Sequence, residues 1–345
     1  MIMATVKASP AVLLTSALTL FLFACTQPSA SPLDSPVPSQ VATESNTTPS
    51  KSHEQEVDAL LASPSANIPG VLIFVSDLFG KPGIGALDLR DRTIRMLTSG
   101  SIDADPSLSS DGRKIVFIST RNRDPYYDIY IMNIDGSDQN PIRSANDLSI
   151  RSNFSPVLSP DGQYIVFHSD RDLNGNMDIY IADISSGNSK RITNHPAMDI
   201  YPSWSPDGRR IIFSSDRDGD YDLYTINIDG SDLRKVFVHP EYSDIFPRYS
   251  PNGQYIVFTT QFYLDSTDSH IALIRSDGSG YRQITQGKGQ YQHATWVGNR
   301  TLVFSGRSNI YEKWRVYISS LENFNPVQLT SQDANFYNPS LIITR

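Results

Sequence analysis

The sequence predicts an all-β fold in which a four-stranded antiparallel sheet is repeated six times around a ring. Three observations predict it: a repeat of about 45 residues, four strand-like segments in each repeat, and an incomplete repeat at either end of the repeating region. The chain has 345 residues, of which 39% are apolar, so it is long enough to bury a large core.

The repeat is clearest in three segments that align without a gap: Pro156 to Phe167, Pro202 to Phe213 and Pro247 to Phe258. Each contains Ser-Pro-Asp-Gly or Ser-Pro-Asn-Gly and then a β-branched run that ends in phenylalanine. The six copies of this phenylalanine are separated by 43, 50, 46, 45 and 46 residues. They lie at Phe74, Phe117, Phe167, Phe213, Phe258 and Phe304. Six anchors predict six units.

The fourth copy shows the four strands within a unit. We expect strands at Tyr201 to Ser205, Ile211 to Ser215, Tyr221 to Ile228 and Leu233 to Phe237, with Pro, Asp and Gly residues forming the turns. One such sheet cannot cover both of its apolar faces and has to pack against neighbours. The pattern therefore predicts a six-bladed β-propeller of four-stranded antiparallel blades.

The two ends of the repeating region predict how the ring closes. The first copy begins at Val71 with its second strand, whereas Asn338 to Ile343 match the first strand of a unit. We therefore expect Leu341 to Ile343 to pair with Val71 to Val75, so that the C-terminal strand completes the first blade and no sheet edge is left open.

The N-terminal residues are typical of an exported lipoprotein. Residues 1–24 combine Lys7 with a short apolar segment, and Leu22-Phe23-Ala24-Cys25 is similar to the bacterial lipobox. Cys25, the only cysteine, is the predicted lipid anchor; ordinary signal-peptide cleavage beside an incidental cysteine is the alternative. The predicted location is extracytoplasmic, in the periplasm or at the cell surface, with the protein anchored to a membrane.

A tether is predicted between this anchor and the folded domain. In the segment 26–52, 16 of 27 residues are Ser, Thr or Pro, which cannot bury enough apolar surface to fold. We assign residues 25–66 to the tether and residues 67–345 to the propeller, expected to be a monomer. The net charge of −8 and the lack of a Lys/Arg cluster argue against a nucleic-acid partner.

The repeated Pro-x-Trp-Ser-Pro-Asp-Gly, Ser-Asp-Arg-Asp-Gly and Asp-Ile-Tyr motifs resemble the PD40 repeat of TolB-like, or WD40-like, propellers over residues 71–344. The resemblance implies an extracytoplasmic propeller that binds envelope proteins, as TolB proteins do in the Tol-Pal system. This sequence departs from that family in two features: an apparent lipid anchor of its own, and no expected counterpart of the N-terminal α/β domain.

One segment has the oxygen-rich spacing of a calcium-binding loop. Its candidate ligands are Asp170, Asp172, Asn174, Asn176 and Asp178, with Gly175 at the turn. Ile181 occupies the position where an EF-hand has glutamate, so an EF-hand is excluded. The alternative is a longer structural turn, in which acids pair with arginine. No other cofactor is predicted.

Two sets of charged residues recur in several copies, which indicates a structural role because a catalytic centre needs asymmetry. They are Asp128, Asp178 and Asp222 before the third strands and Arg121, Arg171 and Arg217 after the second strands.

Aromatic residues precede each expected innermost strand and form a candidate partner surface at one mouth of the channel. They are Phe154, Tyr201, Phe246, Tyr291, Phe336 and Tyr337. Packing between blades is the alternative. His195, His239 and His293 lie near that end at unequal offsets, so a shared metal site is not expected.

The sequence favours a non-catalytic, lipid-anchored binding or scaffold propeller that engages an envelope protein, peptide or glycan. The alternative is a propeller enzyme such as a metal-dependent polysaccharide lyase, which would need the scattered histidines to meet. A serine hydrolase is disfavoured because the sequence has no Gly-x-Ser-x-Gly motif.

Overall fold

The computed structural model describes residues 70–343, except residues 79, 143–150, 172–175, 187 and 263–266. The predicted signal peptide, Cys25 and most of the N-terminal part of the chain lie outside the described residues. All regular secondary structure in the described part is β-strand. This part has no helix with the length and apolarity required to cross a membrane.

The described strands form four sheets of four strands and one sheet of eight, which divides at the single residue pair between β18 and β20 into two groups of four. We call the resulting six groups blades one to six. The innermost strands are β24 (Phe336–Ile343), β4 (Asp103–Leu108), β8 (Asn153–Leu158), β12 (Asp199–Trp204), β16 (Tyr242–Tyr249) and β20 (Gln290–Val297). The second strands are β1 (Gly70–Ser76), β5 (Lys114–Ser119), β9 (Tyr164–Ser169), β13 (Arg210–Ser215), β17 (Tyr255–Phe262) and β21 (Thr301–Arg307). The third strands are β2 (Gly83–Asp88), β6 (Asp128–Asn133), β10 (Asp178–Asp183), β14 (Asp222–Asn227), β18 (Ser269–Arg275) and β22 (Arg315–Ser320). The outer strands are β3 (Ile94–Met96), β7 (Asn140–Pro141), β11 (Ser189–Arg191), β15 (Arg234–Phe237), β19 (Arg282–Gln283) and β23 (Val327–Gln328).

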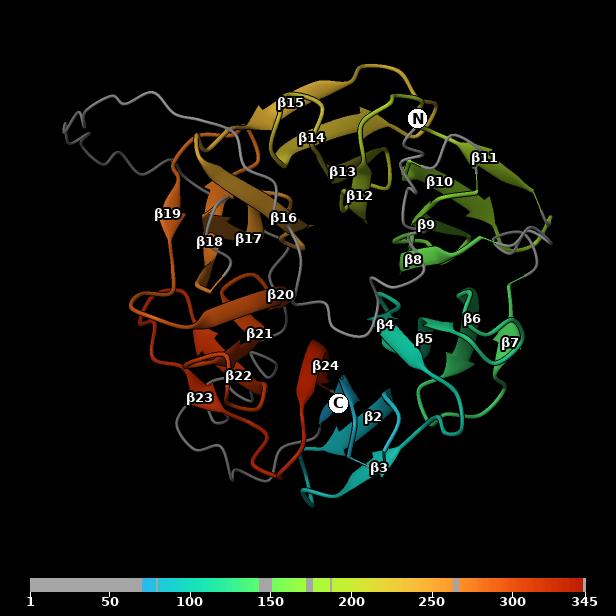
Figure 1. Ribbon diagram of the computed structural model, residues 1–345, viewed down its shortest axis with the longest axis vertical. Coiled ribbons are helices and arrows are strands. Elements are labelled where there is room, and N and C mark those ends of the chain that lie inside the picture. The colour runs from blue at the N-terminus through green and yellow to red at the C-terminus, as the bar shows by residue number, and fades with distance from the viewer. Residues whose placement is uncertain are drawn as a thin grey trace, which may run out of the picture. The chain divides into compact units, whose positions relative to one another are not determined.

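The innermost strands close a ring. β4 contacts β8, and contacts continue through β12, β16, β20 and β24 back to β4. Figure 1 shows the blades around this centre, from blade one in blue and red to blade six in red. Blades five and six also share one parallel residue pair, Ser269 with Gln290. The predicted all-β propeller architecture is confirmed.

The predicted closure is also confirmed. β24 pairs antiparallel with β1, with Leu341 opposite Leu72 and Ile343 opposite Gly70. The turn of blade two packs against this closing strand: Gly112 has φ 67°, and a Cβ there would lie 1.7 Å from Cδ1 of Ile342. Glycine is therefore required at this turn both for its backbone conformation and for the space it leaves.

The motif residues of the repeat have identifiable structural roles. In the fourth copy Ser205 donates to Asp207 at 2.6 Å, and the backbone NH of Arg210 donates to the Ser205 hydroxyl at 2.9 Å, which closes the turn. The indole of Trp204 donates to the carbonyl of Val157 in the preceding blade at 3.0 Å. The motif thus fixes both the turn and the spacing between adjacent innermost strands.

The six repeat phenylalanines are all completely buried and are among the largest side chains of the core. Each lies on a second strand, within the apolar layers between adjacent blades. One of these layers joins the two ends of the described chain: Leu72 and Phe74 from β1 pack with Phe336 and Leu341 from β24 and with Val303 from blade six.

We expect Phe336→Ala to lower the free energy of unfolding by about 3–5 kcal/mol, because Phe336 is fully buried and its ring packs edge-on against Phe74 at 5.0 Å. Chemical denaturation provides the measurement. Tyr311→Ala is the control, since Tyr311 is 92% exposed and its removal is expected to change stability by less than about 0.5 kcal/mol. Equal stability of the two variants would contradict the closure of the ring at β24.

Candidate functional site

The central channel is lined by one unusual residue from each innermost strand. All six of these residues have φ between 47° and 58°, the left-handed region, although none is glycine. A β-bulge interrupts the pairing of each innermost strand at this position. The six channel residues are Asp105, Ser155, Tyr201, Phe246, His293 and Asn338.

The bulge turns each of these residues out of the regular alternation of its strand, so their side chains meet at the centre of the ring. Five of them border a small cavity of about 70 Å³, which Arg248 also lines. The sixth, Tyr201, packs against Phe246 with ring centroids 4.0 Å apart. The fold therefore presents six different side chains at equivalent backbone positions, an arrangement that suits recognition of an asymmetric ligand.

One wall of the channel is polar. Asp105 accepts hydrogen bonds from the backbone NH and the hydroxyl of Ser155, both at 3.1 Å, and from the amide of Asn338 at 2.8 Å. Burial raises the pKa of Asp105, while these donors and the charge of Arg248 oppose the rise. Burial lowers the pKa of Arg248 to about 10, with the charge of Asp105 opposing the shift. The channel is thus bordered by a carboxyl group from blade two and a guanidinium group from β16 of blade five, and both are poorly solvated.

The other wall is aromatic. Tyr201 packs on Phe246, and Phe246 packs on the imidazole of His293 with centroids 4.1 Å apart. Nδ1 of His293 and Oδ1 of Asn338 are buried, and neither has a hydrogen-bond partner among the described residues. Buried polar atoms without a partner are uncommon because each costs free energy, and those in a channel are candidates for contact with a ligand.

A second histidine supports the aromatic wall from behind. His168 is 5% exposed, stacks on Phe154 and contacts the edge of Tyr201. Its Nδ1 accepts a long hydrogen bond of 3.4 Å from the backbone NH of Tyr201, at the bulge itself. Burial lowers the pKa of His168 to about 3, so the imidazole is neutral and can accept this bond.

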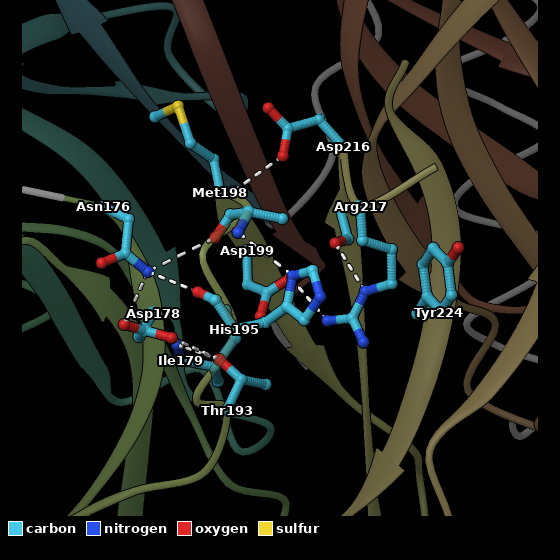
Figure 2. A network of polar contacts seen from close by, with 12 residues as sticks. Asn176, Asp178, Ile179, Thr193, His195, Met198, Asp199, Asp216, Arg217 and Tyr224 are labelled. Atoms are coloured by element: carbon cyan, nitrogen blue, oxygen red, sulfur yellow. Dashed lines mark hydrogen bonds and ion pairs between the residues drawn. The ribbon is translucent and has the colours of Figure 1, made fainter. Parts of the chain in front are cut away.

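The recurring arginines form clamps in three blades. Arg121, Arg171 and Arg217 each donate from Nη2 to the first residue of the adjacent innermost strand, at distances of 3.1, 2.8 and 2.8 Å. The acceptors are Asp103, Asn153 and Asp199. Each guanidinium also lies over a phenylalanine and a tyrosine of its own blade. Figure 2 shows Arg217 reaching Asp199 beside Tyr224. These contacts agree with the structural role predicted for the arginines.

The repeated aspartates also make structural contacts. Asp128 pairs with Arg123, Asp178 with Arg191 at 2.6 Å, and Asp222 with Lys235 at 2.8 Å.

The sequence profile described as the TolB beta propeller domain (PD40) matches residues 143–341, which is more than half of the chain. The chain belongs to the TolB β-propeller family. No curated protein matches it at a significant level.

Solved structures share the fold of this TolB-family chain. TolB from Acinetobacter baumannii is 17% identical with a TM-score of 0.64, over 80% of this chain and 67% of that one. A putative TolB from Agrobacterium tumefaciens is 19% identical with a TM-score of 0.59, over 80% of this chain and 99% of that one. Oligogalacturonate lyase from Vibrio parahaemolyticus is 16% identical with a TM-score of 0.54, over 76% of this chain and 74% of that one. Identities this low show a common fold and do not decide between binding and catalysis.

The predicted aromatic surface is only partly in the channel of this TolB-family propeller. Tyr201 and Phe246 are channel residues, whereas Phe154 is 8% exposed and Phe336 is fully buried. Tyr337 packs in the core of blades one and two, and Tyr291 packs against Phe304. Phe154 and Phe336 are therefore core residues, and placing them on a partner surface was wrong. The error arose because the innermost strands begin about two residues earlier than expected, so these rings point between the blades.

Four of the channel residues were not predicted from the sequence, and His293 was not placed in the channel; the four are Asp105, Ser155, Arg248 and Asn338. A signal was present: five of the six channel residues directly precede the first proline of the repeat, and His293 precedes Ala294 at the equivalent position. Aligning the residue before this proline would have identified the channel set. Searching for one residue type could not, because the six side chains differ.

The candidate calcium ligands are only partly described, since Asp172 and Asn174 lie outside the described residues. Asp170 accepts from the backbone NH of Ser152 at 2.8 Å. The amide of Asn176 donates to Asp178 at 3.2 Å and to the carbonyl of His195 at 2.6 Å, as Figure 2 shows. Asp178 also accepts from Thr193 and Arg191. These bonds give Asn176 and Asp178 structural partners, and calcium binding stays a prediction.

The three histidines are not gathered into a metal site. His195 is exposed, His239 stacks on Tyr242, and His293 lies in the channel. Across the described residues, no three His, Cys, Asp or Glu side chains are grouped so that they could hold a metal ion.

We expect the protein to lose stability as the pH falls from about 7 to about 4, in part through His168. Its imidazole stays neutral in the fold, whereas the unfolded chain takes up a proton below about pH 6.5, which favours unfolding. His168→Phe keeps a ring and removes this proton. The stability lost between pH 7 and pH 5 should then shrink by about 2 kcal/mol.

The measurement is urea denaturation of both proteins at each pH, with His195→Gln, a change at an exposed histidine, as the control. An identical pH dependence for His168→Phe and the wild type would contradict the neutral, buried state of His168.

Proposed function

We propose that this chain is a non-catalytic binding module of the cell envelope that holds part of an envelope partner in its central channel. The observation that carries the proposal is the channel itself: six different side chains at equivalent bulges, with an aromatic wall, a polar wall, and two buried polar atoms that lack partners. Aromatic and polar groups arranged on opposite walls suit an extended, amphipathic segment. An envelope protein, a peptide or a glycan has this chemistry.

Two features of the channel support binding over catalysis. The Ser155 hydroxyl donates to Asp105, and among the described contacts neither His168 nor His293 is hydrogen-bonded to it, so Ser155 is not placed as a nucleophile activated by an imidazole. A metal-dependent lyase would need a grouped set of ligands, and the three histidines predicted for it lie apart among the described residues. The membership in the TolB family supports the same reading.

We expect Phe246→Ala and Arg248→Met to reduce recovery of the channel partner at least about tenfold, since they remove the centre of the aromatic wall and the channel cation. The full chain is immobilised and exposed to extract from its own envelope. Tyr311→Ala, at an exposed loop far from these contacts in sequence, is the matched control. Thermal melting of each variant checks that the fold is retained.

Treatment of the extract with protease separates the two partner classes, because it removes a protein or peptide ligand and leaves a glycan. Undiminished recovery with folded Phe246→Ala and Arg248→Met proteins would contradict a role for the channel.

The proposal includes attachment of the module to a membrane through lipidated Cys25, with residues 25–66 as the tether and an extracytoplasmic location. The lipobox-like sequence and the Ser/Thr/Pro-rich composition of the tether support it. Cys25→Ala is expected to move the protein from the membrane fraction to the soluble fraction, since the acylated thiol would be absent. Fractionation followed by immunoblotting gives the measurement. Release of the wild-type protein without detergent would contradict the anchor.

A further inference from the structure

Blade five keeps the acid of the arginine clamp but lacks its arginine. In blades two, three and four the innermost strand begins with an aspartate or asparagine, which pairs with a serine of the second strand. The clamp arginine lies two residues after this serine. In blade five the pair is Asp244 with Thr260, so the arginine position is occupied by Phe262. Blades one and six carry Phe336 and Tyr291 in place of the acid, and need no arginine.

The carboxylate left behind in blade five is buried and unpartnered. Asp244 has no exposed surface, and among the described residues no hydrogen bond of ordinary geometry reaches either of its side-chain oxygens. In the other clamps the equivalent residue receives a guanidinium NH at about 3 Å. A buried carboxylate without such a donor is costly, so Asp244 requires either a proton or a cation.

The surrounding charges do not supply that cation. Lys235 already pairs with Asp218 at 2.6 Å and with Asp222 at 2.8 Å. His239 is held neutral because burial lowers its pKa, with Asp220 opposing this shift. Burial raises the pKa of Asp244 well above its usual range; the nearby Thr260 hydroxyl opposes the rise, and the charges of Asp222 and Asp220 add to it. Negatively charged side chains therefore outnumber the available cations around Asp244.

Aromatic rings gather around Phe258, the repeat phenylalanine of blade five. Burial raises the pKa of Tyr281, one of these rings, and the nearby charge of Asp244 adds to the rise. The third-strand tyrosine is replaced by Ala272, opposite Phe258, and the rings of Phe237 and Tyr281 pack there instead. Phe237 and Tyr281 are stacked at 5.4 Å, and Tyr281 is 36% exposed, so this cluster extends from Phe258 to solvent. Rings beside a carboxylate are the setting in which a guanidinium binds by charge and by stacking.

We propose that Asp244 and the rings of Phe237 and Tyr281 form a binding site for a guanidinium group from outside the chain, such as an arginine side chain of a partner. The internal clamps of blades two and four show the contacts that it would reproduce: two guanidinium NH groups to a carboxylate and a hydroxyl, with the plane of the group over aromatic rings. In blade five the corresponding acceptors are Asp244 and Thr260. A metal ion fits less well, since no three potential ligands are grouped here within the described residues.

The proposal is tested by thermal melting of the full chain with N-acetyl-L-arginine amide as the probe. We expect the probe to raise Tm by about 2–3 °C at tenfold excess over its Kd, and N-acetyl-L-lysine amide at the same concentration to raise it less, because an ammonium lacks the planar fork. No rise with the arginine probe, or an equal rise with the lysine probe, would overturn the guanidinium site.

Three variants locate the effect. Asp244→Asn keeps the shape and removes the charge, and should abolish the rise; Asp277→Asn changes an acid of the same blade at a turn and should leave it intact. Phe262→Arg restores the internal clamp and should raise Tm without probe while abolishing the response to it. A response that persists in Asp244→Asn would overturn the proposal. None of these variants alters the channel residues, so this result is separable from the test of channel binding.

Discussion

The pairing of β24 with β1 is the interaction on which the rest of the structure depends. It joins two segments more than 260 residues apart in sequence, and it places residues from both ends of the described chain in one apolar layer with blade six. Asn335 adds two hydrogen bonds to Asp77 at 2.8 and 2.7 Å across the same junction. Without this pairing, blade one would lose its innermost strand, both neighbouring sheets would expose an apolar face, and the ring would have two open edges.

Closure also determines the channel chemistry. Asn338, which donates to Asp105 in blade two, belongs to the closing strand, so the polar wall of the channel exists only when the ring is complete. Packing and channel roles fall to different residues: the repeat phenylalanines of the second strands, the turns and the indoles hold the blades together, and the bulge residue of each innermost strand lies at the channel. A propeller can therefore keep one repeated core while each blade contributes a different group to the channel.

The fold could be predicted from the sequence because its determinants are local and repeated. Each Ser-Pro-Asp-Gly turn and each β-branched strand signals its own position, and six copies reinforce one another. Even so, the innermost strands begin about two residues earlier than predicted, as in β12, which begins at Asp199 and not at Tyr201. The bulge caused this difference. The left-handed backbone at Tyr201 and His293 could not be predicted, because that conformation is uncommon for residues other than glycine. The burial of Phe336 could not be predicted from its neighbours in sequence, because it depends on a strand more than 260 residues away.

Repetition makes departures from the pattern informative. A sequence that specifies one structure is normally consistent from local propensity to buried polar contacts, and exceptions tend to mark function or strain. In blades two, three and four the buried acid or amide at the start of the innermost strand has a guanidinium partner, from Arg121, Arg171 or Arg217. Blades one and six have no acid at the equivalent position and need no such partner. Blade five differs from the other five blades: it has an acid at this position, Asp244, but Phe262 occupies the place of the arginine. Replacement of the acid by an apolar residue would remove the cost of its burial, as Phe336 and Tyr291 show at the equivalent positions. Retention of the acid is explained if its partner comes from another molecule.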